Sequence, residues 1–301
     1  MDVLAGFLEA VVRATLPLAL AAIGEMLSER AGFVNVGLEG TMIGGALAAT
    51  VAATLAGTTT GYVAGALTGA GVGALIAAFA IGLRTNQVLT GTAVTGGALG
   101  ITALLSHASF GTTGAALSVP MSTPVTLPLL SGIPVIGRAL FAQPPVTYFV
   151  FALVPVTWWY LTRTAAGLSL RATGENPEAV RASGPSPVRI QALALVFGSA
   201  LGGLGGATLV LAQAGTFAEG MTAGRGFIAL AVVALGRWSP FGVAGAALLF
   251  GATSSLQYLL QALGTDVPYQ VFLELPYLLT IGVLATTGRA GAPAWLGKPL
   301  P

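Results

Sequence analysis

Stretches of about twenty apolar residues recur along this chain, and a helix of that length is what crosses the hydrocarbon core of a bilayer. Charged residues make up only 7% of the 301 residues, against about 25% in soluble proteins. The sequence therefore predicts an all-α polytopic membrane protein, with residues 1–301 as a single domain. About nine transmembrane helices are expected, within a range of eight to ten. The candidate spans are 4–27, 41–56, 62–83, 87–105, 146–162, 190–211, 226–236, 241–263 and 268–287.

Glycine is frequent, with 43 residues, and inside apolar runs it recurs at every fourth position. Gly65, Gly69 and Gly73 form one such series; the other is Gly198, Gly202 and Gly206. Small residues at this spacing let helix backbones approach closely in lipid, where packing replaces the hydrophobic drive between helices. Both series are predicted to be helix-packing seams.

The two longest polar interruptions differ in charge. The segment at about 106–145 is rich in proline and is predicted to be an extracytoplasmic loop. The segment at about 163–189 carries clustered charge and is predicted to be cytoplasmic. With this assignment nine of the twelve basic residues lie on the cytoplasmic side. Because Lys and Arg concentrate in cytoplasmic loops, we expect the N-terminus outside and the C-terminus inside.

Residues of the kinds that catalyse reactions or bind metal ions are few in this sequence. No GxxxxGK[ST] phosphate loop is present, and the single lysine, Lys298, precedes a proline. ATP hydrolysis by this chain, and catalytic residues in general, are therefore not expected. The single histidine, His107, and the lack of cysteine give no metal site, and a membrane-embedded enzyme is disfavoured. Glu9 and Arg13 are spaced to pair on one face of the first span.

One helix in the charged loop is marked at both ends by the sequence. Asn176 can cap its start and Pro177 suits its first position. Gly184 can take a left-handed conformation and Pro185 then ends the helix. Two interpretations are open: a surface helix that joins two spans, or a projecting helix that docks into another protein.

Two polar clusters accompany breaks in apolar helices. Asn35 and Glu39 lie among glycines, and Asn86 and Gln87 precede a run of threonines. Irregular backbone at membrane depth is tolerated only where protein or a water-filled cavity surrounds it, and transporters place their pathways there. The alternatives are a tight turn for the first cluster, and helix capping or intrahelical hydrogen bonding for the second. The predicted translocation pathway residues are Asn35, Glu39, Asn86, Gln87, Thr90 and Thr92.

Several motifs resemble, in order, those of ABC-importer permeases of the branched-chain amino acid/ribose permease superfamily. The similarity is greatest to the nucleoside (simple-sugar-like) branch. It covers about residues 25 to 240. The matching segments are Ser28-Glu29-Arg30-Ala31-Gly32, Asn35-x-Gly37-Leu38-Glu39-Gly40, Asn86-Gln87-Val88, Gly174-Glu175-Asn176-Pro177, Gly224-Arg225-Gly226-Phe227-Ile228-Ala229 and Gly236-Arg237-Trp238-x-Pro240.

The resemblance implies a type II-like ABC importer permease fold in a bacterial inner (plasma) membrane, surrounded by lipid. It also implies a separate ABC ATPase that binds ATP and Mg, an extracytoplasmic substrate-binding lipoprotein, and a second permease that differs from this one. No cofactor on this chain and no nucleic acid partner are implied. The helix at 176–184 would couple to the ATPase. The residues carried over for coupling are Gly174, Glu175, Asn176, Pro177, Glu178, Ala179, Arg181 and Gly184.

The implied substrate is a nucleoside, moved at the expense of ATP hydrolysed by the partner subunit. Two other readings of the same residues stay open. One is an ABC permease for sugars or branched-chain amino acids. The other is a secondary transporter or channel that works alone, since glycine-rich packing and broken helices suit it equally well.

Overall fold

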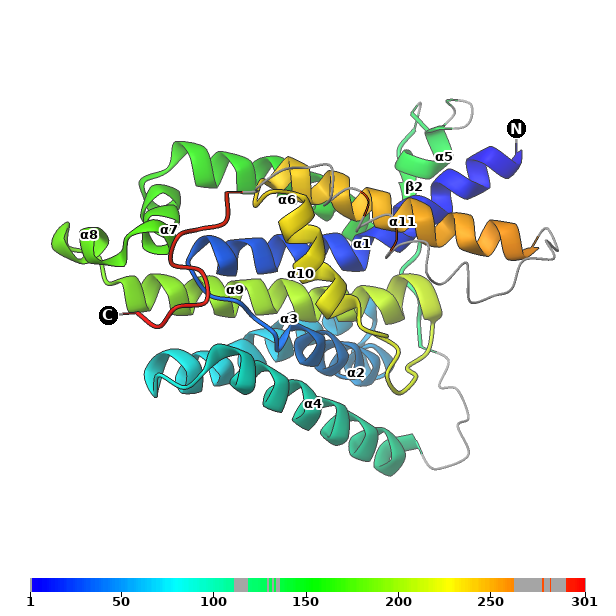
Figure 1. Cartoon of the computed structure of the whole chain (residues 1–301). Coiled ribbons are helices and arrows are strands. Elements are labelled where there is room, and N and C mark those ends of the chain that lie inside the picture. The colour runs from blue at the N-terminus through cyan, green and yellow to red at the C-terminus, as the bar shows by residue number, and fades with distance from the viewer. Residues whose placement is uncertain are drawn as a thin grey trace.

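The computed structural model describes residues 2–110, 119–128, 130–131, 133, 136–262, 278, 282 and 291–300. Helices account for most of them (Figure 1). The long helices are α1 (Asp2–Arg30), α2 (Leu38–Ala56), α3 (Thr58–Ile76), α4 (Gln87–Phe110), α6 (Pro145–Arg163), α9 (Pro187–Thr208) and α11 (Pro240–Ala262). The shorter elements are α5 (Ile136–Phe141), α7 (Ala165–Glu175), α8 (Pro177–Ala182), α10 (Arg225–Leu235), β1 (Val125–Thr126) and β2 (Ala142–Gln143). Wider π-helical turns extend α3 over Ala77–Gly82 and α9 over Leu209–Ala214.

Six helices in the described part of the chain are long and apolar enough to cross a membrane. They are α1, α2, α3 with its π turn, α4, α6 and α9 with its π turn, at the positions of the first six predicted spans. The predicted membrane character is thereby confirmed. α10 and α11 occupy the seventh and eighth predicted spans. The ninth, 268–287, lies outside the described residues except for 278 and 282, so the total of nine stays a prediction.

The helices differ sharply in how much of their surface is covered. In α9 and its π turn 72% of the residues of the apolar stretch are buried, whereas in α4 17% of them are. α9 packs against α1, α2 and α3, and α4 lies along one side of the bundle (Figure 1). The chain thus has a core built around α1 and α9, and α4 presents apolar side chains outward.

Glycine seams account for the close approach of the central helices. The buried residues of α3 are Gly61, Gly65, Gly69, Gly73 and Ile76. A Cβ on Gly69 would fall on the backbone of α9 at Ser199 and Gly203. A Cβ on Gly198 would likewise fall on the Gly24 carbonyl of α1. Both predicted seams are therefore confirmed as packing surfaces, since any side chain there would push the helices apart.

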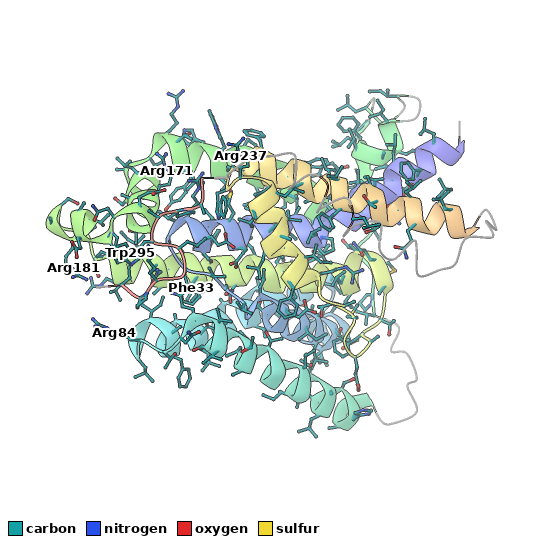
Figure 2. All side chains as sticks on the ribbon, in the orientation of Figure 1. Phe33, Arg84, Arg171, Arg181, Arg237 and Trp295 are labelled. Carbon is teal, nitrogen blue, oxygen red and sulfur yellow. The ribbon has the colours of Figure 1, made fainter. Side chains whose placement is uncertain are left out.

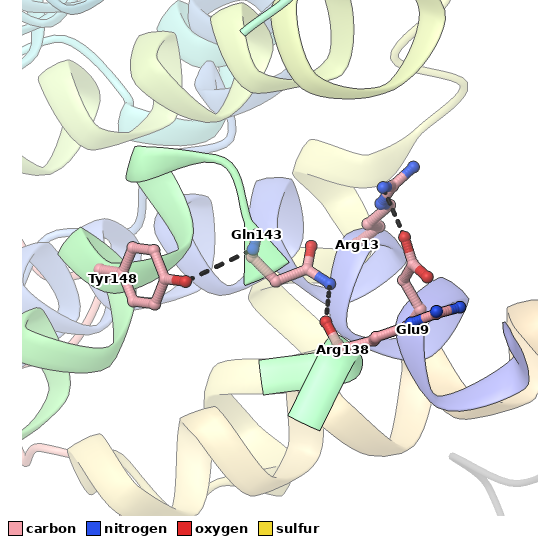
Figure 3. Close-up of polar contacts among 5 residues, drawn as sticks. All are labelled: Glu9, Arg13, Arg138, Gln143 and Tyr148. Carbon is pink, nitrogen blue, oxygen red and sulfur yellow. Dashed lines mark hydrogen bonds and ion pairs between the residues drawn. The ribbon is translucent and has the colours of Figure 1, made fainter. Parts of the chain in front are cut away.

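Within the predicted extracytoplasmic loop, α5 and β2 lie near the N-terminal part of α1 (Figures 1 and 3). Part of this loop forms a two-residue antiparallel ladder, which pairs Val125 with Gln143, so the described fold is not purely helical. Gln143 donates to the Arg138 carbonyl at 3.3 Å, and this bond ties the ladder to α5. Glu9 and Arg13 form the predicted ion pair on α1.

At the opposite end lie α7, α8 and the segment 291–300, beside the last turn of α1 (Figures 1 and 2). Arg171 and Arg181 belong to this end, and so does Trp295 (Figure 2). These segments come from the pieces that the Lys/Arg bias assigns to the cytoplasm. Their clustering at one end agrees with a common side of the membrane.

Candidate functional site

The segment that joins α1 to α2, residues 31–37, is an irregular connection within the bundle. Its first N–H groups bond to carbonyls of α1, and side chains of α1, α4 and α9 bond to other parts of its backbone. The Val34 N–H donates to Gln87 Oε1 at 3.1 Å, and the Asn35 N–H donates to Glu25 Oε1 at 2.8 Å. Gln191 Nε2 donates to the Ala31 carbonyl at 3.1 Å. Protein groups therefore surround this non-helical backbone and hydrogen-bond to it.

Asn35, a predicted pathway residue, lies inside this α1–α2 connection. Its side chain is 1% exposed, and its Nδ2 donates to Ser199 Oγ at 3.1 Å. Glu25, which receives the Asn35 N–H, is fully buried on α1. Asn35 thus joins α1 and α9 to the connection, and its role in the pathway stays a prediction.

Glu39, the second predicted pathway residue in this region, holds the start of α10. Its Oε1 accepts hydrogen bonds from Thr222 Oγ1 at 2.6 Å and from the Gly224 N–H at 2.9 Å. Its Oε2 accepts from the Gly226 N–H at 2.7 Å. The first N–H groups of a helix lack intrahelical partners and carry a partial positive charge. A carboxylate from α2 therefore supplies the acceptors that α10 needs, and Glu39 is 4% exposed.

α10 ends in a turn whose backbone is held from α1. Arg237 and Trp238 both have positive φ, 54° and 52°, which is uncommon for residues other than glycine. Arg30 Nε donates to the Trp238 carbonyl at 2.8 Å, and the Trp238 indole N–H donates to Glu29 Oε2. With 11 residues, α10 is about 16 Å long. It is therefore a half-length helix fixed at both ends, by α2 and by α1.

The predicted coupling segment forms α7 and α8. Asn176 Oδ1 accepts from the Ala179 N–H at 3.1 Å, which caps the start of α8. Gly184 follows the helix with φ 111°, and a Cβ on it would meet no atom within 4 Å. α8 projects from the end of the bundle (Figure 1). Within α8, Pro177 and Val180 are buried. Its outward side is formed by the exposed residues Glu178, Ala179, Arg181 and Ala182.

Gly174, at the end of α7, packs against α1. A Cβ there would fall on the Arg30 carbonyl, so only glycine permits this approach. Glu175, the next residue, is exposed and accepts a hydrogen bond from the Ala294 N–H at 3.2 Å. The predicted coupling residues thus divide between a buried base at α7 and an exposed helix at α8.

The predicted residues at the start of α4 have different surroundings. Asn86 caps α4, with Oδ1 accepting from the Val88 and Leu89 N–H groups at 3.0 and 3.1 Å. Thr92 is exposed, and its hydroxyl donates to the Val88 carbonyl at 3.0 Å. Thr90 exchanges a hydrogen bond with Thr85 at 2.7 Å. Capping and intrahelical bonding therefore account for most of this cluster, and Gln87 contacts the α1–α2 connection.

A groove of about 1090 Å³ lies between α2, α3 and α4. Its walls are mostly apolar, and Phe79 is 44% exposed there. Polar atoms are supplied by threonines, Thr68, Thr85, Thr90 and Thr102. Of the predicted pathway residues only Thr90 lines this groove.

The segment 24–40 is thus the centre of the site. It contacts the start of α4 through Gln87, the start of α10 through Gly224 and Gly226, the turn after α10 through Trp238, and the end of α7 through Gly174. The sequence motifs that resemble the permease family, although far apart along the chain, therefore contact one another in the fold.

A known protein family matches most of this chain. Residues 7–284 match the family described as branched-chain amino acid transport system / permease component. This chain belongs to that permease family. The match covers all the segments that contact one another around residues 24–40.

Relatives of this permease resemble it over nearly their whole length. A guanosine ABC transporter permease protein of Bacillus subtilis is 36% identical over 97% of this chain and 96% of its own. A nucleoside ABC transporter permease protein of Lactococcus lactis is 36% identical over 92% and 90%. A putative glucose ABC transporter permease protein of Haloferax volcanii is 34% identical over 95% and 92%. No solved structure shows significant similarity to this permease.

Several residues that hold the permease site together were not among the site residues predicted from the sequence. They are Glu25, Glu29, Gln191, Ser199 and Trp238. Glu25 and Glu29 could have been noticed, because acids inside an apolar span are costly and usually have a specific role. They also share one helix face. Ser199 and Gln191 give no such signal, because isolated polar residues in a span usually bond within their own helix.

Proposed function

We propose that this permease is the membrane-spanning subunit of an ABC importer for nucleosides, with ATP hydrolysed by a separate subunit. The observation that carries the proposal is α8. It is a capped helix that projects from one end of a chain related end to end to guanosine and nucleoside permeases. Since the chain has no phosphate loop of its own, an ABC importer built on it would receive the energy of ATP hydrolysis through a contact with another protein.

α8 is suited to receive such a contact. Its two buried residues, Pro177 and Val180, fix it to the bundle, and its remaining side chains face outward. The capping bond from Asn176 keeps a helix of six residues folded, although so short a helix is unstable by itself. ATP and Mg would be bound by the partner ATPase, and this end of the bundle would face the cytoplasm.

The groove between α2, α3 and α4 supports a pathway for the solute. Its volume of about 1090 Å³ is ample for a nucleoside, since pockets for small molecules measure about 300–1,000 Å³. Phe79 offers an aromatic face for a base, and Thr90 offers a hydroxyl for a sugar or base edge. We propose that a second, different permease closes the open side of the groove, and that an external binding lipoprotein delivers the nucleoside.

The coupling role is tested by Gly184→Val in the assembled transporter. A β-branched residue is strained at φ 111°, so the end of α8 must rearrange although there is space for the side chain. We expect ATP-driven uptake to fall at least about tenfold, equivalent to about 1.4 kcal/mol, with the permease still in the membrane. Gly57→Val is the matched control, because Gly57 has φ 89° and open space in the α2–α3 turn. Unchanged uptake and ATPase stimulation in Gly184→Val would refute the role of α8.

The substrate class is tested by uptake into membrane vesicles that contain the whole transporter. Radiolabelled guanosine and other nucleosides should enter in an ATP-dependent manner, and excess unlabelled nucleoside should compete. Glucose and branched-chain amino acids should neither enter nor compete. Uptake of glucose with no effect of nucleosides would instead align this permease with its relative from Haloferax volcanii.

A further inference from the structure

Residues 292–298, which we name the strap, form a compact turn beside α7 (Figures 1 and 2). The Lys298 N–H donates to the Trp295 carbonyl at 3.1 Å, and the Trp295 indole donates to the Pro299 carbonyl at 3.1 Å. Lys298 Nζ donates to the Ala294 carbonyl at 2.9 Å and lies 5.4 Å from the centre of the Trp295 ring. The strap therefore has a defined shape of its own.

The strap is bonded to the last turn of α7, where α8 begins. The Trp295 N–H donates to the Gly174 carbonyl at 2.8 Å. The Ala294 N–H donates to Glu175 Oε2 at 3.2 Å. Asn176, the next residue along the chain, caps α8. The two bonds thus hold the base from which α8 projects.

The other end of the strap is bonded to the α1–α2 connection and to α4. The Gly297 N–H donates to the Gly32 carbonyl at 3.1 Å. Gln87 Nε2 donates to the Lys298 carbonyl at 3.5 Å, while Gln87 Oε1 accepts from the Val34 N–H. The Leu296 side chain packs against the main core. The strap therefore contacts both the end of α7 and the α1–α2 connection.

Gly174 is enclosed from two sides by these contacts. α1 meets it at the Arg30 carbonyl, and the strap meets it at the Trp295 N–H. Because a Cβ on Gly174 would strike the Arg30 carbonyl, the end of α7 lies in direct backbone contact with α1. A force on α8 would therefore pass into α1 and the strap together.

We propose that the strap positions α8 and transmits its displacement to the α1–α2 connection and to α4. This inference rests on the proposed function, in which α8 is the contact for the ATPase. Trp295, Gly297 and Glu175 are positioning residues in this scheme, because none of them faces the groove. Energetic coupling between distant sites runs through such continuous contacts when the elements have discrete arrangements.

The first test loosens the strap in the complete transporter, reconstituted with its ATPase, its second permease and its binding protein. Gly297→Val strains a residue at φ 73°, and Trp295→Ala removes the ring that shapes the turn. Solute moved per ATP hydrolysed should fall about five- to tenfold, within the usual range of coupling between sites. Abundance in the membrane and co-purification of the ATPase should not change. Gly57→Val and Trp159→Ala are the matched controls, because Gly57 lies in open space and Trp159 is an exposed tryptophan of α6. Trp295→Phe should keep most of the coupling.

The second test locks the strap in place, which is possible because the chain has no cysteine. Glu175→Cys with Ala294→Cys places two thiols at the bonded pair, and a short thiol-specific cross-linker joins them. If the strap positions α8, cross-linking should restore or preserve the amount of solute that is moved per ATP hydrolysed. Loss of uptake on cross-linking would show that the strap must detach, and would overturn the proposal.

The outcomes separate this inference from the function on which it rests. If Gly184→Val uncouples the transporter but strap variants move solute per ATP as the wild type does, only the strap proposal fails. If neither Gly184→Val nor the strap variants alter ATP-driven uptake, the role of α8 fails, and the strap proposal fails with it.

Discussion

Replacement of Glu39 by glutamine should destabilise α10. The carboxylate accepts three hydrogen bonds, from Thr222 Oγ1, the Gly224 N–H and the Gly226 N–H, at 2.6 to 2.9 Å. A glutamine oxygen can keep the first two. Its NH₂ group then faces the Gly226 N–H, so two donors meet and one buried N–H loses its acceptor.

The size of the effect follows from these contacts. A hydrogen bond to a charged group contributes about 1.5–3 kcal/mol, and a buried donor without a partner costs about 1–3 kcal/mol. Part of the helix-dipole interaction, about 0.3–1 kcal/mol, is lost as well. These terms overlap, and we expect the free energy of local opening of α10 to fall by about 2–4 kcal/mol.

The assay is hydrogen–deuterium exchange of the purified permease, read at peptides from α10. Since each 1.4 kcal/mol is a factor of ten, exchange of the α10 amides should speed up about 30- to 700-fold. Glu9→Gln is the matched control, because Glu9 pairs with Arg13 on the partly exposed end of α1 and such pairs contribute about 1 kcal/mol or less. Exchange in α10 within about threefold of the wild type in Glu39→Gln would refute the capping role.

Three further predictions test other parts of the structure. Gly69→Ala should lower the free energy of unfolding by about 1–3 kcal/mol, because the new Cβ would overpack α9. Gly71→Ala is the control and should not lower it, since there is open space around Gly71. Equal melting temperatures of the two variants would contradict the seam. Trp238→Phe should lower the free energy of unfolding by about 1–3 kcal/mol, because Glu29 loses its indole donor. Thermal unfolding of the variant and the wild type in detergent measures this difference. Phe79→Ala should raise the KM for nucleoside uptake about five- to tenfold, since base–aromatic stacking contributes about 1–3 kcal/mol, and an unchanged KM would remove Phe79 from the pathway.

Much of the fold could be predicted from the sequence because it follows from local physics. Each of the first six spans is long enough to satisfy its own backbone in lipid, so apolar length alone located it. α8 was predicted from Asn176, Pro177 and Gly184, because a cap, a first-turn proline and a left-handed end act within a few residues. The glycine seams were visible for the same reason, since a repeat of four residues marks one face of a helix.

The sequence could not predict which helix faces pack against one another. Gly203 approaches both Gly65 and Gly69, although it belongs to neither predicted series. Glu39 caps a helix that begins more than 180 residues later, and Asn35 reaches Ser199 on α9. The reason is physical: an acid or amide beside a glycine break shows that a buried polar group needs a partner, but the pattern does not say where the partner is. The membrane spans, the seams and the α8 helix are therefore determined by sequence alone, whereas the meeting of the motifs around residues 24–40 and the position of the strap beside α7 are decided by the packing of the whole chain.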